Sequence, residues 1–229
     1  MDAAKLESTL GVTFTNKDLL IQAFVHRSYL NENPRFYLDH NERLEFLGDA
    51  VLELIVTDYL YANYPNPEGD LTAWRAALVN AKMLAKIAER LRMNDFLLLS
   101  KGEAKDKGKA RQVILANAIE AFIGAMYLDQ GYGAVTPFVH AHIIPELAHI
   151  IALQSYKDAK STFQELAQEK RGVTPRYIVL KEWGPDHAKN FSIGVFLDDE
   201  QVGVGEGVSK QDAQQSAADD ALTKLGWRQ

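Results

Sequence analysis

The sequence predicts two domains, an all-helical domain followed by a smaller α+β domain. Apolar residues recur at helical spacing over residues 1–150, whereas apolar and polar residues alternate, as in strands, from Tyr177 onward. The pattern changes around Gln154–Lys157, so we place the domains at residues 1–150 and 157–227. With 229 residues, 47% of them hydrophobic, the chain is long enough to bury two ordinary cores.

Composition excludes several classes of protein. The chain has no cysteine, which rules out disulfides, zinc–thiolate centres and cysteine nucleophiles and fits a reducing compartment. Met1–Leu10 lacks the features of a signal peptide, and no apolar stretch approaches the ~18 residues of a membrane span. We therefore expect a cytoplasmic protein with no membrane partner. The net charge of −6 is unlike that of a general nucleic-acid binder, so such a role must rest on local geometry.

The first domain is expected to begin with two short helical segments within Leu6–Leu30, and Asn31–Asp39 is expected to form a polar turn region. Asn41 has the side chain of an N-cap. The helix that it starts should run to about Tyr64.

This helix carries an acidic face. Glu42, Glu45 and Asp49 stand at i, i+3 and i+7, which places their carboxylates on one side. Like charges so close repel unless water screens them or a cation neutralises them, and Mg²⁺ prefers oxygen ligands. From spacing alone, a solvated face is the simpler interpretation. The opposite side is expected to pack into the core through Leu44, Leu47, Val51, Leu54 and Ile55.

Residues 64–70 hold prolines and a glycine that break the helical pattern, which resumes as one helix over Leu71–Arg90. Lys101–Arg111 is expected to be a loop, and Val135–Leu153 a further helix interrupted near Pro145.

Val113–Leu128 is apolar nearly all round, as in a buried helix. Asn117 and Glu120 interrupt it at i and i+3. Because buried polar groups need partners, a glutamate here is more informative than one on a surface. Structural and functional roles for Glu120 both remain open at this point.

The second domain has the order α-β-β-β-α, from a helix at about Asp158–Arg171 to a final helix at Lys210–Leu225. The first of these helices presents a narrow polar stripe opposite Phe163 and Leu166. Any amphipathic helix has such a face, so the stripe alone decides nothing. Its members are Ser161, Gln164, Glu165 and Gln168.

The run Asn41–Leu52, N-E-R-L-E-F-L-G-D-A-V-L, resembles the signature of the ribonuclease III family. His26–Ser28, Glu68–Asp70 and Ile114–Asp129 support this resemblance. The C-terminal region resembles a double-stranded-RNA-binding domain, so the resemblance covers nearly the whole chain.

The resemblance implies Mg²⁺-dependent hydrolysis of double-stranded RNA by a homodimer, with Mn²⁺ as a substitute and no small-molecule cofactor. The products would have 5′-phosphate and 3′-hydroxyl ends with short 3′ overhangs, and the setting would be rRNA and mRNA processing. The family's metal-binding positions fall on Glu45, Asp49, Asn117 and Glu120, with Asp49 and Glu120 as the catalytic pair.

Other positions carry further implied roles. Glu42 and Glu68 match acidic residues that handle RNA near the cut, and Phe46 matches a residue that docks into the partner subunit. Without the resemblance, Phe46 would be assigned to the core. In the second domain the implied RNA-binding residues are Ser161, Gln164, Glu165, Gln168, His187, Ser209 and Lys210.

Two positions depart from the family pattern. Asn117 stands where most members have aspartate. Three explanations are open: natural variation with activity retained, an inactivated variant, or a non-catalytic double-stranded-RNA-binding protein. We favour an active enzyme because the other acidic positions are intact. Gln211 stands where a second lysine is common, and residues 157–229 hold 10 Lys and Arg against 12 Asp and Glu, a net of −2. RNA affinity and its salt dependence should therefore be modest.

Overall fold

The computed structural model describes residues 2–105, 108–152, 159–185 and 189–227. The chain divides into two compact units, residues 1–156 (unit 1) and 157–229 (unit 2), and each is described by itself. In the described residues, no helix is both long enough and apolar enough to span a membrane.

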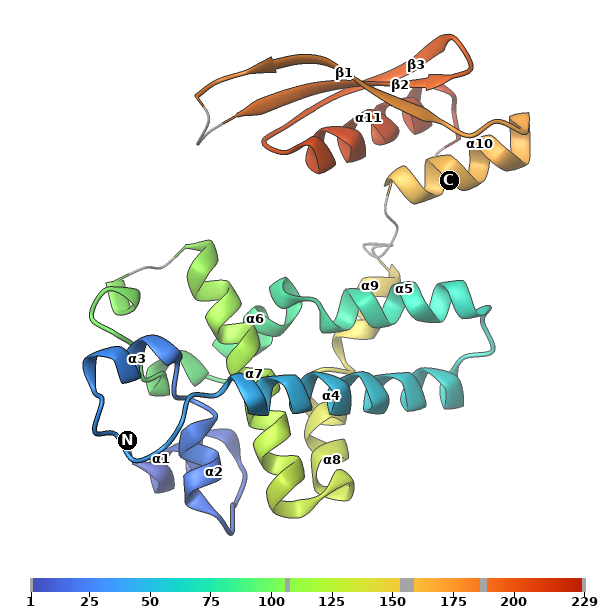
Figure 1. Ribbon diagram of the computed structural model, residues 1–229. Coiled ribbons are helices and arrows are strands. Elements are labelled where there is room, and N and C mark those ends of the chain that lie inside the picture. The colour runs from blue at the N-terminus through green and yellow to red at the C-terminus, as the bar shows by residue number, and fades with distance from the viewer. Residues whose placement is uncertain (1, 106–107, 153–158, 186–188, 228–229) are drawn as a thin grey trace. The chain divides into compact units, whose positions relative to one another are not determined.

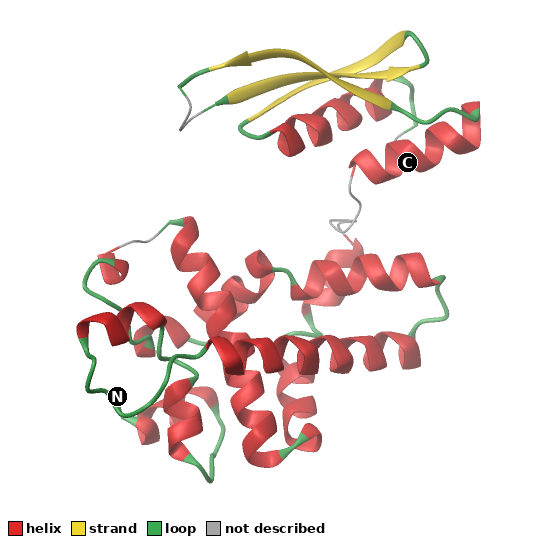
Figure 2. Ribbon diagram, in the orientation of Figure 1, coloured by secondary structure: helices red, strands yellow, loops and turns green. Residues whose placement is uncertain are grey.

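Within the described residues, the regular elements of unit 1 are all helices, apart from an isolated parallel bridge between Val25 and Leu98 (Figure 1, Figure 2). Its elements in order are α1 (Ala3–Leu10), α2 (Lys17–Gln22), α3 (Arg27–Glu32), α4 (Glu42–Asn63), α5 (Glu68–Val79), α6 (Ala81–Arg90), the 3₁₀ turns η1 (Met93–Phe96) and η2 (Glu103–Lys105), α7 (Lys109–Gln130), α8 (Tyr132–His142) and α9 (Glu146–Ala152).

The long helices α4 and α7 cross at the centre of unit 1, and the other helices pack around them (Figure 1). Leu52 and Ile55 of α4 are buried in the same core as Ile119 and Phe122 of α7. This is the buried α7 that its all-round apolar pattern predicts.

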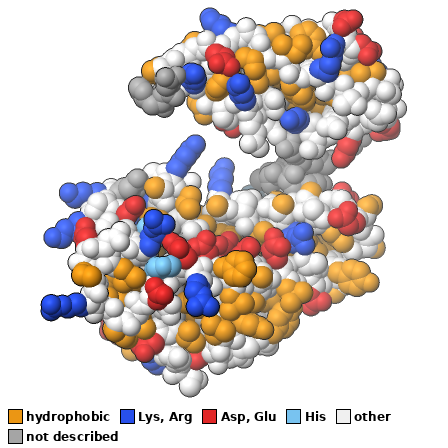
Figure 3. All heavy atoms as spheres, viewed as in Figure 1, with side chains coloured by type: hydrophobic (Ala, Val, Ile, Leu, Met, Phe, Trp, Pro, Cys, Tyr) orange, Lys and Arg blue, Asp and Glu red, His pale blue; other side chains and the backbone are white. Residues whose placement is uncertain are grey.

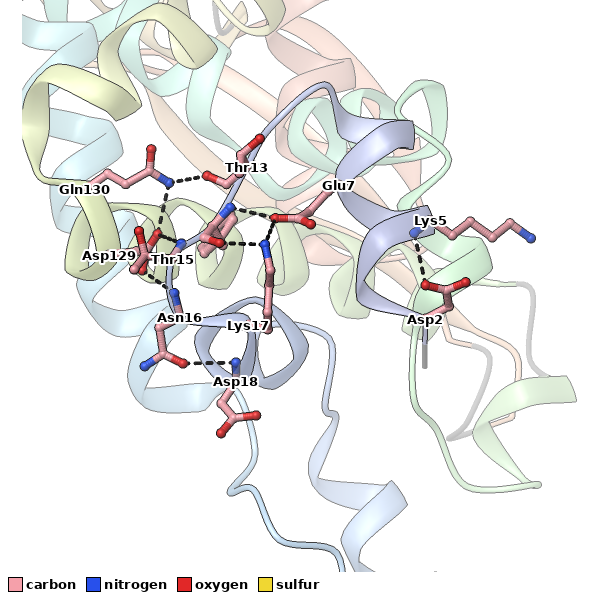
Figure 4. A network of polar contacts seen from close by, with 11 residues as sticks. Asp2, Lys5, Glu7, Thr13, Thr15, Asn16, Lys17, Asp18, Asp129 and Gln130 are labelled. Carbon is pink, nitrogen blue, oxygen red and sulfur yellow. Dashed lines mark hydrogen bonds and ion pairs between the residues drawn. The ribbon is translucent and has the colours of Figure 1, made fainter.

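The N-terminal segment contains three short helices where the sequence predicted two. Gly11, with φ of 67°, ends α1, and the Asn16 side chain caps α2 by accepting a hydrogen bond from Asp18 N. Asp129, near the end of α7, accepts hydrogen bonds from Thr15 N (2.8 Å) and Asn16 N (2.7 Å) (Figure 4). These bonds hold the connection between α1 and α2 against α7.

The helix predicted over Leu71–Arg90 is in fact two helices, α5 and α6. The backbone of Asn80 is extended (φ −70°, ψ 154°), and its side chain accepts a hydrogen bond from Met83 N as the N-cap of α6. α5 also begins earlier than expected, at Glu68 within the predicted break.

Two expectations for α4 were wrong. Asn41 occupies the N-cap position, but its backbone is helical and its side chain makes no capping bond. Leu54 is 57% exposed, although it was predicted to face the core. At 100° per residue Leu54 lies about 120° from the centre of the buried face, beside the exposed residues Phe46 and Tyr61.

Unit 2 has the predicted α-β-β-β-α order: α10 (Ala159–Arg171), β1 (Arg176–Trp183), β2 (Asn190–Leu197), β3 (Glu200–Gly207) and α11 (Lys210–Lys224). The antiparallel sheet has the order β1-β2-β3, and the two helices pack on one of its faces (Figure 2). Three glycines of β3 let α11 approach closely, because added Cβ atoms would lie 2.1–2.5 Å from its backbone: Gly203, Gly205 and Gly207.

Candidate active site

Two glycines set the geometry where α4 crosses α7. A Cβ atom built on Gly48 would lie 1.7 Å from the carbonyl oxygen of Glu120, and one on Gly124 would lie 2.2 Å from that of Leu44. Any larger residue at either position would force the helices apart. The close approach places the acidic face of α4 beside the polar positions of α7.

Three carboxylates interact at this crossing. The pKa of Glu120 is raised to about 8 by burial and by the nearby charges of Asp49 and Glu45. Burial and the charges of Glu42 and Asp49 also raise the pKa of Glu45, against a hydrogen bond from the Asn117 side chain. Three of the four predicted metal-binding residues therefore influence one another electrostatically, and the fourth bonds to one of them.

The chemistry of this set fits a hard divalent cation, which prefers carboxylate and amide oxygens and would relieve the repulsion. Within the described residues, none of the three carboxylates forms an ion pair with a basic side chain. The described part of the chain also contains no group of three His, Asp or Glu side chains already gathered closely enough to hold a metal ion.

The remaining acidic candidates differ in their distance from this group: Glu42 is near enough for its charge to act on Glu45, whereas Glu68 is remote. The Glu42 carboxylate is exposed and lies 3.6 Å from Arg27 Nη1. Glu68 begins α5 and accepts a hydrogen bond from Thr72 Oγ1 (2.8 Å). Because α5 starts just beyond the end of α4, and α4 rises about 27 Å after Glu45, Glu68 is far from the crossing in its own chain.

α4 has a third face, which is apolar and exposed. Phe46 is 81% exposed, which excludes the core position that its residue type alone would suggest, and Tyr61 is 82% exposed. Together with Leu54 these residues form a stripe (the α4 apolar stripe). Figure 3 shows acidic side chains gathered in a band over α4, with hydrophobic side chains beside it.

Asn41 anchors the first turn of α4, which carries Glu42 and Glu45. Its side chain is 3% exposed and donates a hydrogen bond to Ala23 O (3.1 Å), while its backbone N donates to Val25 O (2.9 Å). The same segment holds Leu98 through the bridge at Val25.

Unit 2 exposes the polar stripe of α10, as predicted. Ser161, Gln164, Glu165 and Gln168 line a groove of about 620 Å³ together with Glu169 and Thr174. Ser209 is the N-cap of α11, and its hydroxyl bonds to Asp212, whereas Lys210 lies 3.4 Å from Glu182. His187 lies outside the described residues.

Residues 16–147 match the family model described as Ribonuclease-III-like, which spans more than half of the chain, and residues 159–225 match the double-stranded RNA binding motif. The chain belongs to the ribonuclease III family. Ribonuclease 3 of Oceanobacillus iheyensis is 45% identical over 226 residues, which cover 98% of this chain and 99% of that protein. Ribonuclease 3 of Geobacillus kaustophilus is 46% identical over 222 residues, which cover 96% and 90%.

The structural comparison agrees. The nuclease domain of ribonuclease III from Campylobacter jejuni, described with a flexible region involved in dimer formation, aligns with a TM-score of 0.57 at 43% identity. The alignment covers 63% of this chain and 97% of that one. The chain is thus an endoribonuclease of the double-stranded-RNA-specific family, with a helical nuclease unit followed by a double-stranded-RNA-binding motif.

Two features of the site were not predicted from the sequence. The first is the close packing at Gly124. An isolated glycine inside an apolar helix is a signal of such packing, but the spacing of the carboxylates does not reveal it. The anchoring role of Asn41 was also missed, since its residue type suggested a cap.

Proposed function

We propose that unit 1 cleaves double-stranded RNA with Mg²⁺, or Mn²⁺ in its place, held by Glu45, Asp49, Asn117 and Glu120. The observation that carries this proposal is Glu120, whose carboxyl has a pKa raised to about 8 by burial and by the nearby charges of Asp49 and Glu45. A group of this kind is neutral at pH 7 unless a cation compensates its charge, and such strongly perturbed carboxyls cluster at functional sites.

The chain's own residues would divide the work. When bound by these residues, a divalent cation would lower the pKa of a water and would stabilise the leaving 3′ oxygen. Asp49 and Glu120 supply the negative charge that holds the cation, from two helices locked together by the glycine crossing. Asn117 donates its amide hydrogen to Glu45, which orients that carboxylate and leaves the amide oxygen as a ligand. The products are RNA ends with 5′-phosphate and 3′-hydroxyl groups and short 3′ overhangs.

The proposed active form is a homodimer joined through the α4 apolar stripe. Exposed aromatic side chains on one helix face are typical of interfaces. A second copy is a suitable occupant because the stripe runs beside the acidic face, so pairing would put two sites on one duplex. Because Glu68 lies far from the crossing of its own chain, it reaches a cut only at the partner's site.

Unit 2 would hold the duplex by shape. Duplex RNA offers a wide minor groove lined by 2′-hydroxyls, which suits the polar stripe of α10. Glu42 would contact RNA beside the cut, and Lys210 would face a phosphate with the N-terminus of α11, which Ser209 caps. His187 is proposed to enter a neighbouring minor groove. We place the activity in rRNA and mRNA processing in the cytoplasm, from family membership.

The test is cleavage of a labelled RNA duplex by the wild-type chain and Glu120→Ala over a series of Mg²⁺ and Mn²⁺ concentrations. We expect paired cuts from the wild type and a loss in Glu120→Ala larger than the roughly 10- to 100-fold that removing an outer-shell partner causes. If the wild type gives no product at any concentration, the alternative suggested by Asn117 is favoured, namely a non-catalytic RNA-binding protein. If Glu120→Ala cleaves RNA as fast as the wild type, Glu120 is not part of the active site.

A further inference from the structure

Two grooves of similar size flank the polar stripe of α10, and they differ in charge. The groove between α10 and α11, of about 610 Å³, is lined by two lysines and by serine and glutamines, with no carboxylate among its described lining residues. The other groove, of about 620 Å³, holds two glutamates and no lysine among its described lining residues. Ser161 and Gln164 line both grooves. A phosphate backbone would therefore be attracted to the first groove and repelled from the second.

Lys160 is held in the first groove by three contacts. Its Nζ donates a hydrogen bond to Gln214 Oε1 (2.8 Å) and lies 5.2 Å from the centre of the Tyr177 ring. Its backbone N donates to Gln215 Oε1 (3.2 Å). The first turn of α10 is therefore tied to α11, and the ammonium group is fixed close to the groove.

Lys210 has a similar environment across the groove. Its Nζ lies 5.5 Å from the centre of the Phe191 ring and 3.4 Å from Glu182 Oε1. Each groove lysine is thus positioned over an aromatic ring of the sheet. An ammonium that is already positioned loses less rotamer freedom when it binds an anion than a free surface lysine does.

We propose that Lys160 binds a backbone phosphate of duplex RNA in this groove, as the partner of Lys210. It supplies the second cation that is missing from α11, where Gln211 replaces the usual lysine. Gln214 holds the ammonium in the free protein and becomes a second donor to the phosphate once its oxygen is released. The acidic groove then faces the hydrogen-bond donors of the minor groove, so the two grooves together set the direction in which the duplex crosses α10.

This inference rests on the proposed binding of duplex RNA by unit 2. The experiment measures binding of a fluorescent RNA duplex to the full chain in chelator, over a series of salt concentrations. The variants are Lys160→Gln, Lys160→Arg and Lys210→Gln. Lys170→Gln is the matched control, because Lys170 lies on the same helix, over the Trp227 ring at 5.9 Å, outside the groove.

We expect Lys160→Gln and Lys210→Gln each to weaken binding about five- to tenfold near 0.1 M salt and to reduce the slope of log K against log salt by about 1. Lys160→Arg and Lys170→Gln should stay within about twofold of the wild type, with its slope. Far-UV circular dichroism and thermal midpoints check that each variant is folded.

Several outcomes would overturn the proposal. The proposal fails if Lys160→Gln binds like Lys170→Gln. It also fails if Lys160→Gln loses affinity with an unchanged salt slope, which is the sign of a structural defect rather than of a lost phosphate contact. If Lys160→Arg loses the slope as Lys160→Gln does, charge is not the cause. A wild-type chain that binds no duplex would refute RNA binding by unit 2 itself, and the inference with it.

Discussion

Units 1 and 2 both use glycine to bring two backbones together, but they use the proximity differently. In unit 1, Gly48 and Gly124 let α4 cross α7, which brings the acidic face of α4 beside the half-buried Glu120. In unit 2, the glycines of β3 seat α11 against the sheet, and the polar groups of α10 remain exposed. One unit concentrates charge at a point, whereas the other spreads hydrogen-bonding groups over a surface.

Because of this difference, cleavage and RNA binding should respond differently to single substitutions. Residues of a charge cluster act as a unit, so losing one of them removes most of the activity. Contacts on an RNA-binding surface contribute in smaller, nearly additive and salt-dependent steps. Cleavage should therefore depend sharply on a few residues of unit 1, and duplex affinity gradually on many residues of unit 2.

The largest expected effect comes from filling the two close approaches. Gly48→Ala should lower the free energy of unfolding of unit 1 by about 3 kcal/mol or more and abolish cleavage, because the new Cβ would meet the Glu120 carbonyl. Gly205→Ala should destabilise unit 2 in the same way and remove duplex binding. Thermal unfolding, cleavage and RNA-binding assays measure the three effects.

Gly133→Ala is the control for both, since Gly133 lies in α8 and an added Cβ would meet no atom within 4 Å. It should be neutral or slightly stabilising, because alanine favours helices. If Gly48→Ala folded and cleaved RNA like Gly133→Ala, the crossing would not be what assembles the site.

A smaller effect is expected at the α4 apolar stripe. Phe46→Ser should weaken dimerisation about 30-fold or more, the size of a hot-spot loss, while leaving each protomer folded, because Phe46 is 81% exposed. Sedimentation equilibrium over a range of concentrations measures this. Val208→Ser is the control in unit 2, where Val208 is 68% exposed, and it should leave the association unchanged. If both variants associate equally well, Phe46 is not part of the dimer interface.

The next effect is on stability as a function of pH. The pKa of Glu120 is about 8 in the folded chain against an ordinary 4.5, so the unfolded chain loses this proton first as pH rises. Stability from Glu120 is therefore present below about pH 4.5 and lost as pH rises toward 8. In chelator, Glu120→Gln should unfold a few degrees above the wild type at pH 8 and converge with it near pH 4.5.

Glu89→Gln is the control, because it removes one carboxylate at an exposed position of α6, and it should keep the wild-type pH dependence. Mg²⁺ should raise the wild-type midpoint at pH 8 and leave Glu120→Gln unchanged. A wild-type stability that rose from pH 5 to pH 8 relative to Glu120→Gln would contradict the buried position of this carboxyl.

Much of the fold followed from periodicity. The apolar patterns of α4 and α7 predicted both long helices, and alternation predicted the three strands of unit 2. What failed depended on information that a local pattern lacks. Leu54 has the spacing of a core residue but lies outside the buried face of α4, and Asn80 interrupts a continuous helical pattern by capping α6.

The candidate site was predictable to a similar degree. Spacing identified the acidic face, and the apolar surroundings singled out Glu120, but neither could show that the two helices meet. The two helices meet because Gly48 faces the Glu120 carbonyl and Gly124 faces the Leu44 carbonyl. These contacts pair segments that are distant in the sequence. The buried hydrogen bond from Asn41 to Ala23 is equally non-local, so its side chain was assigned to the nearest helix end.

The central claim is that one cation is held jointly by Glu45, Asp49, Asn117 and Glu120. The most direct measurement is a Mg²⁺ titration of RNA cleavage by the wild-type chain beside Asn117→Asp. A fourth carboxylate adds attraction for the cation at close range, so the aspartate variant should reach half-maximal cleavage at about tenfold less Mg²⁺. An equal or greater Mg²⁺ requirement in Asn117→Asp would contradict the claim.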